Sequence, residues 1–237
     1  MTIIIGTAGW TIPSKDARAF GQGDSALARY ATRFRGVEIN SSFHRPHRKE
    51  TWQRWAETVP EDFQFAVKLP KTITHGAKLV DCEGLLETFL SESASLGPKF
   101  SVLLVQLPPS LAFDAATAEG FFKPLAERGI AAIACEPRHA SWFAAEADAL
   151  LESWKVHRVA ADPARTPNAG EPGGWRGISY YRLHGSPVMY RSSYDDARLA
   201  EYAAAIRKQA DRPVWCMFDN TASSAATANA LTLDEMT

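Results

Sequence analysis

The sequence lacks paired cysteines, long hydrophobic runs and an excess of either charge. Its 237 residues include three cysteines, and no two of them stand at the CxxC spacing of a zinc site or redox pair. A small, odd and scattered set of cysteines is typical of a reduced, cytoplasmic protein. The longest apolar runs, such as VLLV at 102–105, are much shorter than the roughly 18 residues of a membrane span. No basic residue precedes Lys15, so we expect no signal or transit peptide.

The charges of the chain are nearly balanced. Lysine and arginine number 26 against 27 aspartates and glutamates, which gives a formal net charge of −1. Such a chain has no global positive field to attract duplex nucleic acid or an acidic membrane, so an anion site must be local. We therefore expect no membrane partner and disfavour nucleic acid, while the oligomeric state stays open.

Short apolar segments alternate with longer segments of helical composition along the whole chain. This alternation is the pattern of βα units around a parallel sheet. Eight strands are predicted at Ile3–Gly6, Val37–Asn40, Phe65–Lys68, Val102–Gln106, Ala131–Glu136, His157–Ala161, Ile178–His184 and Val214–Phe218. Seven helices are predicted at Ser25–Phe34, Lys49–Glu57, Leu85–Ser95, Ala115–Glu127, Ala144–Trp154, Asp195–Gln209 and Ala222–Leu233.

The number of these units favours a closed barrel. Eight parallel strands with right-handed crossovers close into a TIM barrel at about 250 residues. An open dinucleotide-binding sheet would carry GxGxxG after its first strand, where this chain has GTAGW at 6–10. Segment 162–177 is rich in proline and glycine, which predicts a loop in place of the sixth helix. We expect an α/β fold, a TIM (β/α)8 barrel, that forms one domain over residues 1–237.

Polar residues stand at the ends of nearly all predicted strands. Because side chains alternate along a strand, Glu38 and Asn40 share one face, as do Arg182 and His184, and these faces converge on the barrel axis. The C-terminal mouth is where this fold collects catalytic groups. The expected catalytic residues are Glu38, Lys68, Glu136 and His184. The expected substrate contacts are Trp10, Asn40, Phe43, Gln106, Arg138, His139, Trp142, Asp162, Arg182, Asn220 and Ser223.

A purely structural interpretation of this ring stays open. Three carboxylates and three cations at the strand ends would neutralise one another as an ion-pair network. They are Glu38, Glu136 and Asp162 with Lys68, Arg138 and Arg182. In such a ring we expect Lys68 to be ion-paired and protonated rather than a free base or Schiff-base nucleophile. His75, in the next loop, would either close over the mouth or cap its own turn.

Seven segments resemble a known family when they are taken together and in this order. They are GTAGW, VEINSSFHR, FAVKLPKTITH, LLVQLPP, CEPRHASW, YYRLHG and FDNTASSAATANA. The set spans nearly the whole chain and resembles the YecE-like family of bacterial proteins of unknown function. The resemblance implies a TIM barrel and no established reaction. The family usually has EFRH and FNN where this chain has EPRH and FDN, so Pro137 and Asp219 depart from its pattern.

The turns after the seventh and eighth strands have the composition of an anion site. Many TIM barrels hold a phosphate there at a helix N-terminus, although Ser223 and its neighbours also serve as ordinary helix caps. We therefore expect a small anionic substrate, a phosphorylated sugar or nucleotide derivative, handled by metal-independent acid–base chemistry with no cofactor. Aromatic rings, Tyr190 among them, would line the mouth. Hydrolysis, isomerisation and lyase chemistry stay open, as does the question whether the protein is an enzyme.

Two other functions remain as alternatives. The first is a hydrolase or isomerase with a divalent metal, whose candidate ligands are Glu38, Glu136, His139, Asp162 and His184. Three cations in the same ring argue against it, because they would repel a divalent ion. The second is a non-catalytic binder of a nucleotide or single-stranded nucleic acid, with the basic loop 44–48 as its contact surface. The near-zero net charge argues against this one.

Overall fold

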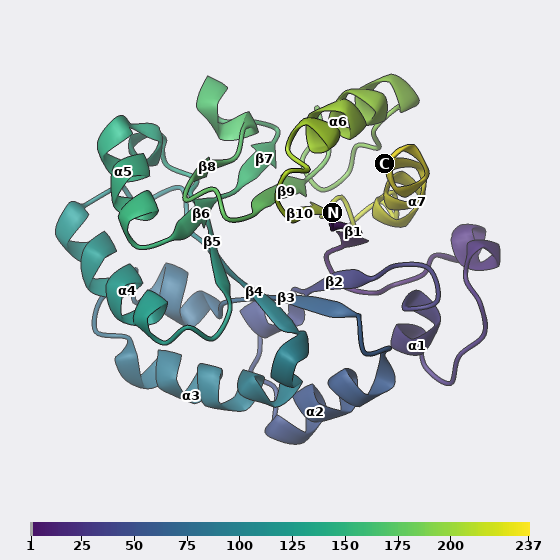
Figure 1. The fold of residues 1–237 in the computed structure, drawn as a ribbon, viewed down its shortest axis with the longest axis horizontal. Helices are drawn as coiled ribbons and strands as arrows, with labels where there is room; N and C mark the ends of the chain where they lie inside the picture. Colours follow the sequence, from purple (N-terminus) through teal and green to yellow (C-terminus); the bar gives the residue numbers. More distant parts are fainter. Residues whose placement is uncertain (1) are drawn as a thin grey trace.

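A ring of parallel strands is surrounded by helices in the computed structural model, which describes residues 2–237 (Figure 1). Its strands are β1 (Ile3–Thr7), β2 (Gly36–Ile39), β3 (Gln64–Lys68), β4 (Phe100–Gln106), β5 (Ala132–Glu136), β6 (Val156–Arg158), β7 (Ala160–Asp162), β9 (Ser179–Leu183) and β10 (Val214–Phe218). A short antiparallel strand, β8 (Gly173–Gly174), pairs with β6. The expected TIM barrel is confirmed.

The barrel consists of two hydrogen-bonded arcs. We call β1-β10-β9-β7 the β1 arc and β2-β3-β4-β5-β6-β8 the β2 arc. The sixth barrel strand serves both arcs, since β6 pairs with β5, β7 pairs with β9, and only Val159 separates them. The other seam is a single bridge between Ala8 and Glu38. The sequence predicted one continuous sixth strand, and the structure divides it where the pairing partner changes.

Between residues 2 and 237, seven α-helices lie around the outside of the strands (Figure 1). They are α1 (Ala26–Tyr30), α2 (Lys49–Thr58), α3 (Glu83–Ser93), α4 (Ala115–Glu127), α5 (Ala145–Ser153), α6 (Asp196–Lys208) and α7 (Ala226–Met236). The expected loop after the sixth strand is confirmed, with a 3-10 turn at Pro167–Gly170. None of the helices between residues 2 and 237 has both the length and the apolar character that crossing a bilayer requires.

Side-chain alternation divides the core in two. Outward-facing strand residues such as Val37 and Val67 pack against the helices, whereas Ala66, Ala134 and Tyr180 belong to a smaller cluster inside the barrel. Small residues on some strands make room there for the large rings on others. Charged groups replace this apolar filling toward the C-terminal ends of the strands.

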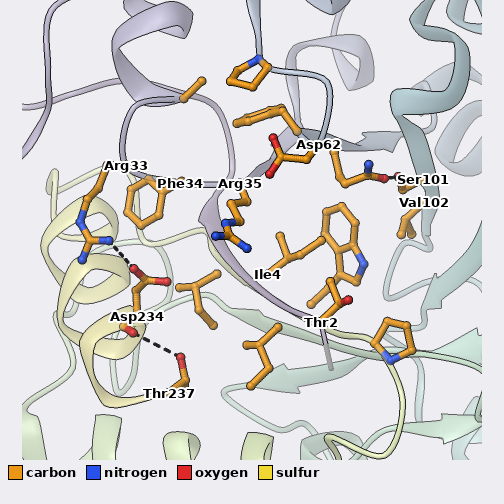
Figure 2. Close-up of a pocket in the computed structure, with 18 of the residues that line it drawn as sticks. Thr2, Ile4, Arg33, Phe34, Arg35, Asp62, Ser101, Val102, Asp234 and Thr237 are labelled. Carbon is orange, nitrogen blue, oxygen red and sulfur yellow. Dashed lines mark hydrogen bonds and ion pairs between the residues drawn. The ribbon is translucent and has the colours of Figure 1, made fainter.

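A cavity of about 1160 Å³ opens at the opposite end of the barrel, where the strands begin. Figure 2 shows Ile4 and Val102 at this cavity, with the Arg35 side chain projecting into it and Asp62 nearby. In TIM barrels this N-terminal end serves stability, and chemistry takes place at the other end. The candidate site is therefore expected at the C-terminal mouth.

The seam between β1 and β2 needs glycine at position 6. A Cβ atom there would overlap the carbonyl oxygen of Gly36 on the neighbouring strand, so the backbone would have to move. We expect Gly6→Ala to lower the free energy of unfolding by about 1–3 kcal/mol, measured by urea denaturation. Gly84→Ala in α3 is the matched control, because the added Cβ meets no atom of residues 2–237 within 4 Å beyond its chain neighbours and the backbone of its own helix. Equal stability of the two variants would contradict the close approach of these strands.

Candidate functional site

Arg182 lies at the centre of the mouth and is fully buried. Its Nε and Nη2 donate to the two oxygens of Glu38 at 2.9 and 2.7 Å. Nη1 donates to Glu136 at 2.5 Å and to the Gln106 side-chain oxygen at 3.2 Å, and Nη2 donates to Asp219 at 2.9 Å. One guanidinium therefore binds three carboxylates, and these come from both arcs of the barrel.

His184 and Arg138 form the next layer of the cluster. The His184 ring lies between two carboxylates, with Nε2 at 2.9 Å from Glu136 and Nδ1 at 3.0 Å from Asp219. Nε2 also lies 2.9 Å from Nη2 of Arg138. Arg138 Nη2 lies 2.5 Å from the same Glu136 oxygen. The carboxylates of the ring are thus surrounded by cations and donors.

These contacts keep Glu136 and Asp219 ionised. Burial alone would raise the pKa of Glu136, but Arg138, Arg182 and His184 outweigh it and hold that pKa well below its usual range. Burial also acts to raise the pKa of Asp219, and there too Arg182 and His184 reverse the effect and lower it. A carboxylate held in this way is a poor proton donor near neutral pH. The two groups are better suited to holding cations than to acid catalysis.

Both carboxylate oxygens of Glu38 also accept hydrogen bonds. Both its oxygens accept from Arg182, and the Tyr180 hydroxyl donates to one of them at 3.0 Å. The carboxylate is fully buried. Its geometry therefore suits an anchor for Arg182, which leaves acid–base work to other groups in the mouth.

Lys68 differs from the arginines of this ring because it has no carboxylate partner in the described chain. It is 5% exposed, yet it makes no salt bridge or side-chain hydrogen bond within residues 2–237, and its ammonium lies 4.1 Å from the centre of the Phe43 ring. Burial, and secondarily Arg182, lowers the pKa of Lys68 to about 8. The expectation that Lys68 is ion-paired is therefore wrong. The physical reason is that arginine and histidine donors already occupy the ring carboxylates.

His75 approaches the same place from the next loop. It lies in a π-helical turn, Thr72–Gly76, directly after β3, and such turns are frequent at functional sites. Its ring packs edge-on against Phe43 with centroids 5.0 Å apart. Nδ1 forms a hydrogen bond with Thr74 at 2.8 Å. Burial and the nearby cations, Lys68 first among them, lower the pKa of His75.

Three of the expected substrate contacts have a buried polar atom with no hydrogen-bond partner within the described chain: Arg138 (Nε), Asn40 (Oδ1) and Asn220 (Oδ1). Asn220 turns outward, which leaves Arg138 and Asn40 at the mouth. Buried polar atoms are nearly always paired, so each such atom calls for an explanation. Of the two at the mouth, one is a donor on a cation and the other is an acceptor, which is the combination that an anionic, hydroxyl-bearing ligand would satisfy.

The loop after β9 covers part of the cluster. Met189 places its sulfur 3.7 Å from Nη1 of Arg138, and the Tyr190 ring packs edge-on against His184 with centroids 5.6 Å apart. Tyr190 has a φ of +67° and is 39% exposed. Phe43 and Tyr190 are thus aromatic groups next to the charged residues.

Asp162 does not belong to the ring, contrary to expectation. It pairs with Leu183 in the strand register, on the face turned toward the helices, and it accepts from Tyr194 at 2.7 Å and Arg198 at 3.1 Å. The third carboxylate is Asp219, which the sequence analysis did not select. Counting by twos from Met217, a residue of the barrel interior, would have placed Asp219 on the inner face.

The predicted anion site at the last helix also differs. Asn220 turns outward, where its amide nitrogen donates to Ser192 and Asn229, each at 2.9 Å. Ser223 is exposed in a turn, and α7 begins only at Ala226, without a side-chain cap. Residues 220–224 therefore do not form the N-terminus of a helix.

Three further expected contacts lie in the surroundings of the mouth. Trp142 is 1% exposed, and its Nε1 donates to the Leu111 carbonyl at 3.0 Å, so it belongs to the core. His139 caps a 3-10 turn through Ser141. Trp10 packs edge-on against Trp55 of α2. These roles are accounted for by packing and capping.

The metal alternative finds no preformed ligand set. Among residues 2–237, no three histidine, cysteine, aspartate or glutamate side chains gather in an arrangement that would hold a metal ion. His139 and Asp162, two of its candidate ligands, point to partners outside the ring.

Comparisons with known proteins agree with this fold. UPF0759 protein YecE of Escherichia coli (strain K12) is 36% identical over 106 residues, which cover 45% of this chain and 38% of YecE. UPF0759 protein YunF of Bacillus subtilis (strain 168) is 29% identical over 154 residues, which cover 60% of this chain and 52% of YunF. The matched segments thus span about two fifths to half of these relatives.

Solved structures extend the similarity over the whole chain. A DUF72 family protein from Thermotoga maritima MSB8 superposes with a TM-score of 0.81 at 21% identity, covering 100% of this chain and 99% of that one. One from Enterococcus faecalis V583 gives 0.81 at 20% identity, covering 99% and 95%. Residues 4–237 match the family described as "Protein of unknown function DUF72". The resemblance found in the sequence is confirmed, and the chain belongs to the DUF72 family.

Proposed function

We propose that this protein is an enzyme that binds a small anionic polar metabolite at the C-terminal mouth and transforms it by acid–base chemistry without a resident metal. One observation carries the proposal: Lys68 and Arg138 keep hydrogen-bond donors that no acceptor within residues 2–237 satisfies. A ligand that brings its own negative charge would satisfy both. Three unpaired, buried cysteines fit a reducing, cytoplasmic setting.

The mouth residues suggest a phosphorylated sugar or a nucleotide derivative. Nε of Arg138 would donate to the phosphate or carboxylate, and Asn40 Oδ1 would accept from a hydroxyl. Phe43 and Tyr190 offer flat apolar surfaces beside these polar groups, which is the usual environment of a sugar ring or base.

Lys68 is the residue that we assign to proton transfer. A lysine with a pKa of about 8 exchanges protons close to neutral pH, where an ordinary lysine stays protonated. Arg182, Arg138 and Lys68 together would repel a divalent cation, which supports metal-independent chemistry. Glu38, Glu136 and Asp219 hold the two arginines in place.

Binding of simple anions tests the proposal. We expect isothermal titration to detect binding of inorganic phosphate and ribose 5-phosphate, and Arg138→Gln to weaken it by about 10- to 100-fold, the value of a charge-assisted hydrogen bond. Arg128→Gln, which removes a surface arginine that pairs with Glu87 at 2.7 Å, should leave binding unchanged. Thermal melts of both variants would check that they are folded.

Two outcomes would contradict the proposal. One is equal anion binding by wild-type protein and Arg138→Gln, because the anion would then lie elsewhere. The other is binding of a single-stranded oligonucleotide that weakens steeply with salt while neither small anion binds, which would favour the non-catalytic nucleic-acid binder.

A further inference from the structure

We propose that Lys68 is a nucleophile that forms an imine with a small anionic aldehyde or ketone. This rests on the proposed function, since Arg138 would hold the anionic group of the same molecule. It narrows the substrate class from any anionic metabolite to one with a reactive carbonyl. It also narrows the reaction to isomerisation or bond cleavage next to that carbonyl.

The position of Lys68 is the first support. The side chain leaves the last residue of β3 on the inward face, two residues after Ala66 of the barrel interior. The backbone carbonyl of Lys68 accepts a hydrogen bond from the Ser42 hydroxyl at 2.6 Å, which fixes the strand end. An amine on a rigid strand end at the mouth is well placed to meet a bound substrate.

The absence of a partner within residues 2–237 is the second support. Arg182 and Arg138 are both bound to carboxylates, whereas the Lys68 ammonium lies over the face of Phe43 and forms no salt bridge among the described residues. An ion-paired lysine is held protonated, and a protonated amine cannot attack a carbonyl. A buried lysine close to another cation loses its proton more easily, and burial and Arg182 act on Lys68 in this way.

The fraction of neutral amine follows from this environment. With a pKa of about 8, about one Lys68 side chain in ten is neutral at pH 7, against about one in 2,500 for an ordinary lysine. The larger neutral fraction favours reaction at Lys68 over reaction at surface lysines.

The chemical step balances with the groups present. The neutral Nζ attacks the carbonyl carbon, a C–N bond forms, and one proton moves from nitrogen to the carbonyl oxygen to give a carbinolamine. The proton that the departing hydroxyl needs comes from solvent, because burial and the nearby cations lower the pKa of His75 and leave its ring mostly neutral at pH 7. The C–O bond then breaks, water leaves, and a protonated imine remains next to the carboxylate ring.

Reductive trapping tests the inference. Wild-type protein is incubated at pH 7 with glyoxylate, the smallest anionic aldehyde, or with glycolaldehyde phosphate, then reduced with borohydride and mapped by peptide mass spectrometry. We expect the secondary amine at Lys68 to form at least about ten times faster than at Lys71, an exposed lysine three residues later. Lys68→Arg should remove the fast label, and Lys71→Arg should retain it.

The outcomes separate this inference from the proposed function. Equal labelling of Lys68 and Lys71 in wild-type protein by both probes overturns the imine, and this result needs no variant to fold. If phosphate binding still depends on Arg138 in that case, the proposed function stands with Lys68 as a base only. If neither binding nor labelling is found, both proposals fall.

Discussion

Replacing Arg182 with methionine should prevent folding or lower the free energy of unfolding by about 5 kcal/mol or more. Removing one partner of a buried ion pair typically costs about 3–5 kcal/mol, because a charge is left uncompensated in the interior. Here one guanidinium binds three buried carboxylates, those of Glu38, Glu136 and Asp219. Urea denaturation followed by tryptophan fluorescence would measure the loss, and the yield of soluble protein would report complete failure to fold.

Arg198→Met is the matched control. Arg198 also binds two carboxylates, at 3.1 Å to Asp162 and 2.6 Å to Glu201, but its side chain is 47% exposed. Exposed pairs contribute about 0–1 kcal/mol, so this variant should stay close to wild type. If Arg182→Met is as stable as Arg198→Met, the central cluster does not stabilise the fold.

Replacing Lys68 with methionine should have the opposite sign and raise the stability of the protein at pH 7. The pKa of Lys68 falls from 10.5 to about 8 on folding, so the folded state disfavours the charged form. At 1.36 kcal/mol for each pKa unit, the charged lysine costs up to about 3 kcal/mol below pH 8. Methionine has a similar length and no charge, and its thioether suits a gap beside Phe43.

The pH dependence provides the check. Above pH 8 the folded state loses the Lys68 proton while the unfolded chain keeps it up to pH 10.5, so the cost disappears across this window. The stability advantage of Lys68→Met should therefore shrink as the pH rises from 8 to 10. Tyrosines and cysteines of the unfolded chain also titrate there, while burial raises the pKa of their folded counterparts, but this holds in both proteins and the difference isolates Lys68. A variant less stable than wild type at pH 7 would mean that Lys68 stabilises the fold in its charged form.

These two predictions together describe a functional compromise. Loss of Arg182 is expected to destabilise the barrel, whereas loss of Lys68 is expected to stabilise it. Active sites commonly hold groups that lower stability because the chemistry needs them. If Lys68→Met is more stable than wild type at pH 7 and is no longer labelled by an anionic aldehyde, the same residue both lowers stability and carries the reactive amine.

Local sequence signals were sufficient for most of the fold. Each strand is a short apolar or β-branched segment, and the sequence places Val214–Phe218 at its observed bounds. The last helix is the main exception, because its predicted start at Ala222 lies in a turn in which Ser224 has a φ of +58°. A serine is compatible with either a helix or such a turn, and only the packing of the chain decides between them.

The sequence predicted most of the residues that face the barrel axis, but it did not predict which of them form ion pairs with one another. Alternation correctly directed Glu38, Arg182 and His184 to the axis. It was not applied to Asp162, whose parity places it on the outer face. The pairing of Lys68 depends on competition, because bidentate arginine takes the carboxylates that would otherwise neutralise it. Local sequence does not show which of several donors, located on distant strands, will bind a given carboxylate.

The two-arc construction has a consequence for the growing chain on the ribosome. Glu38 and Arg182 are separated by 144 residues, and Glu136 also precedes Arg182. Glu136 already has Arg138 as a partner in the nascent β2 arc, whereas Glu38 emerges before its native counter-charge, Arg182, has been synthesised. Burying Glu38 unpaired would be costly, so we expect the packing around it to stay loose until β9 appears. Completion of the fold is thereby tied to the last quarter of translation, when a single arginine arrives to close the ring.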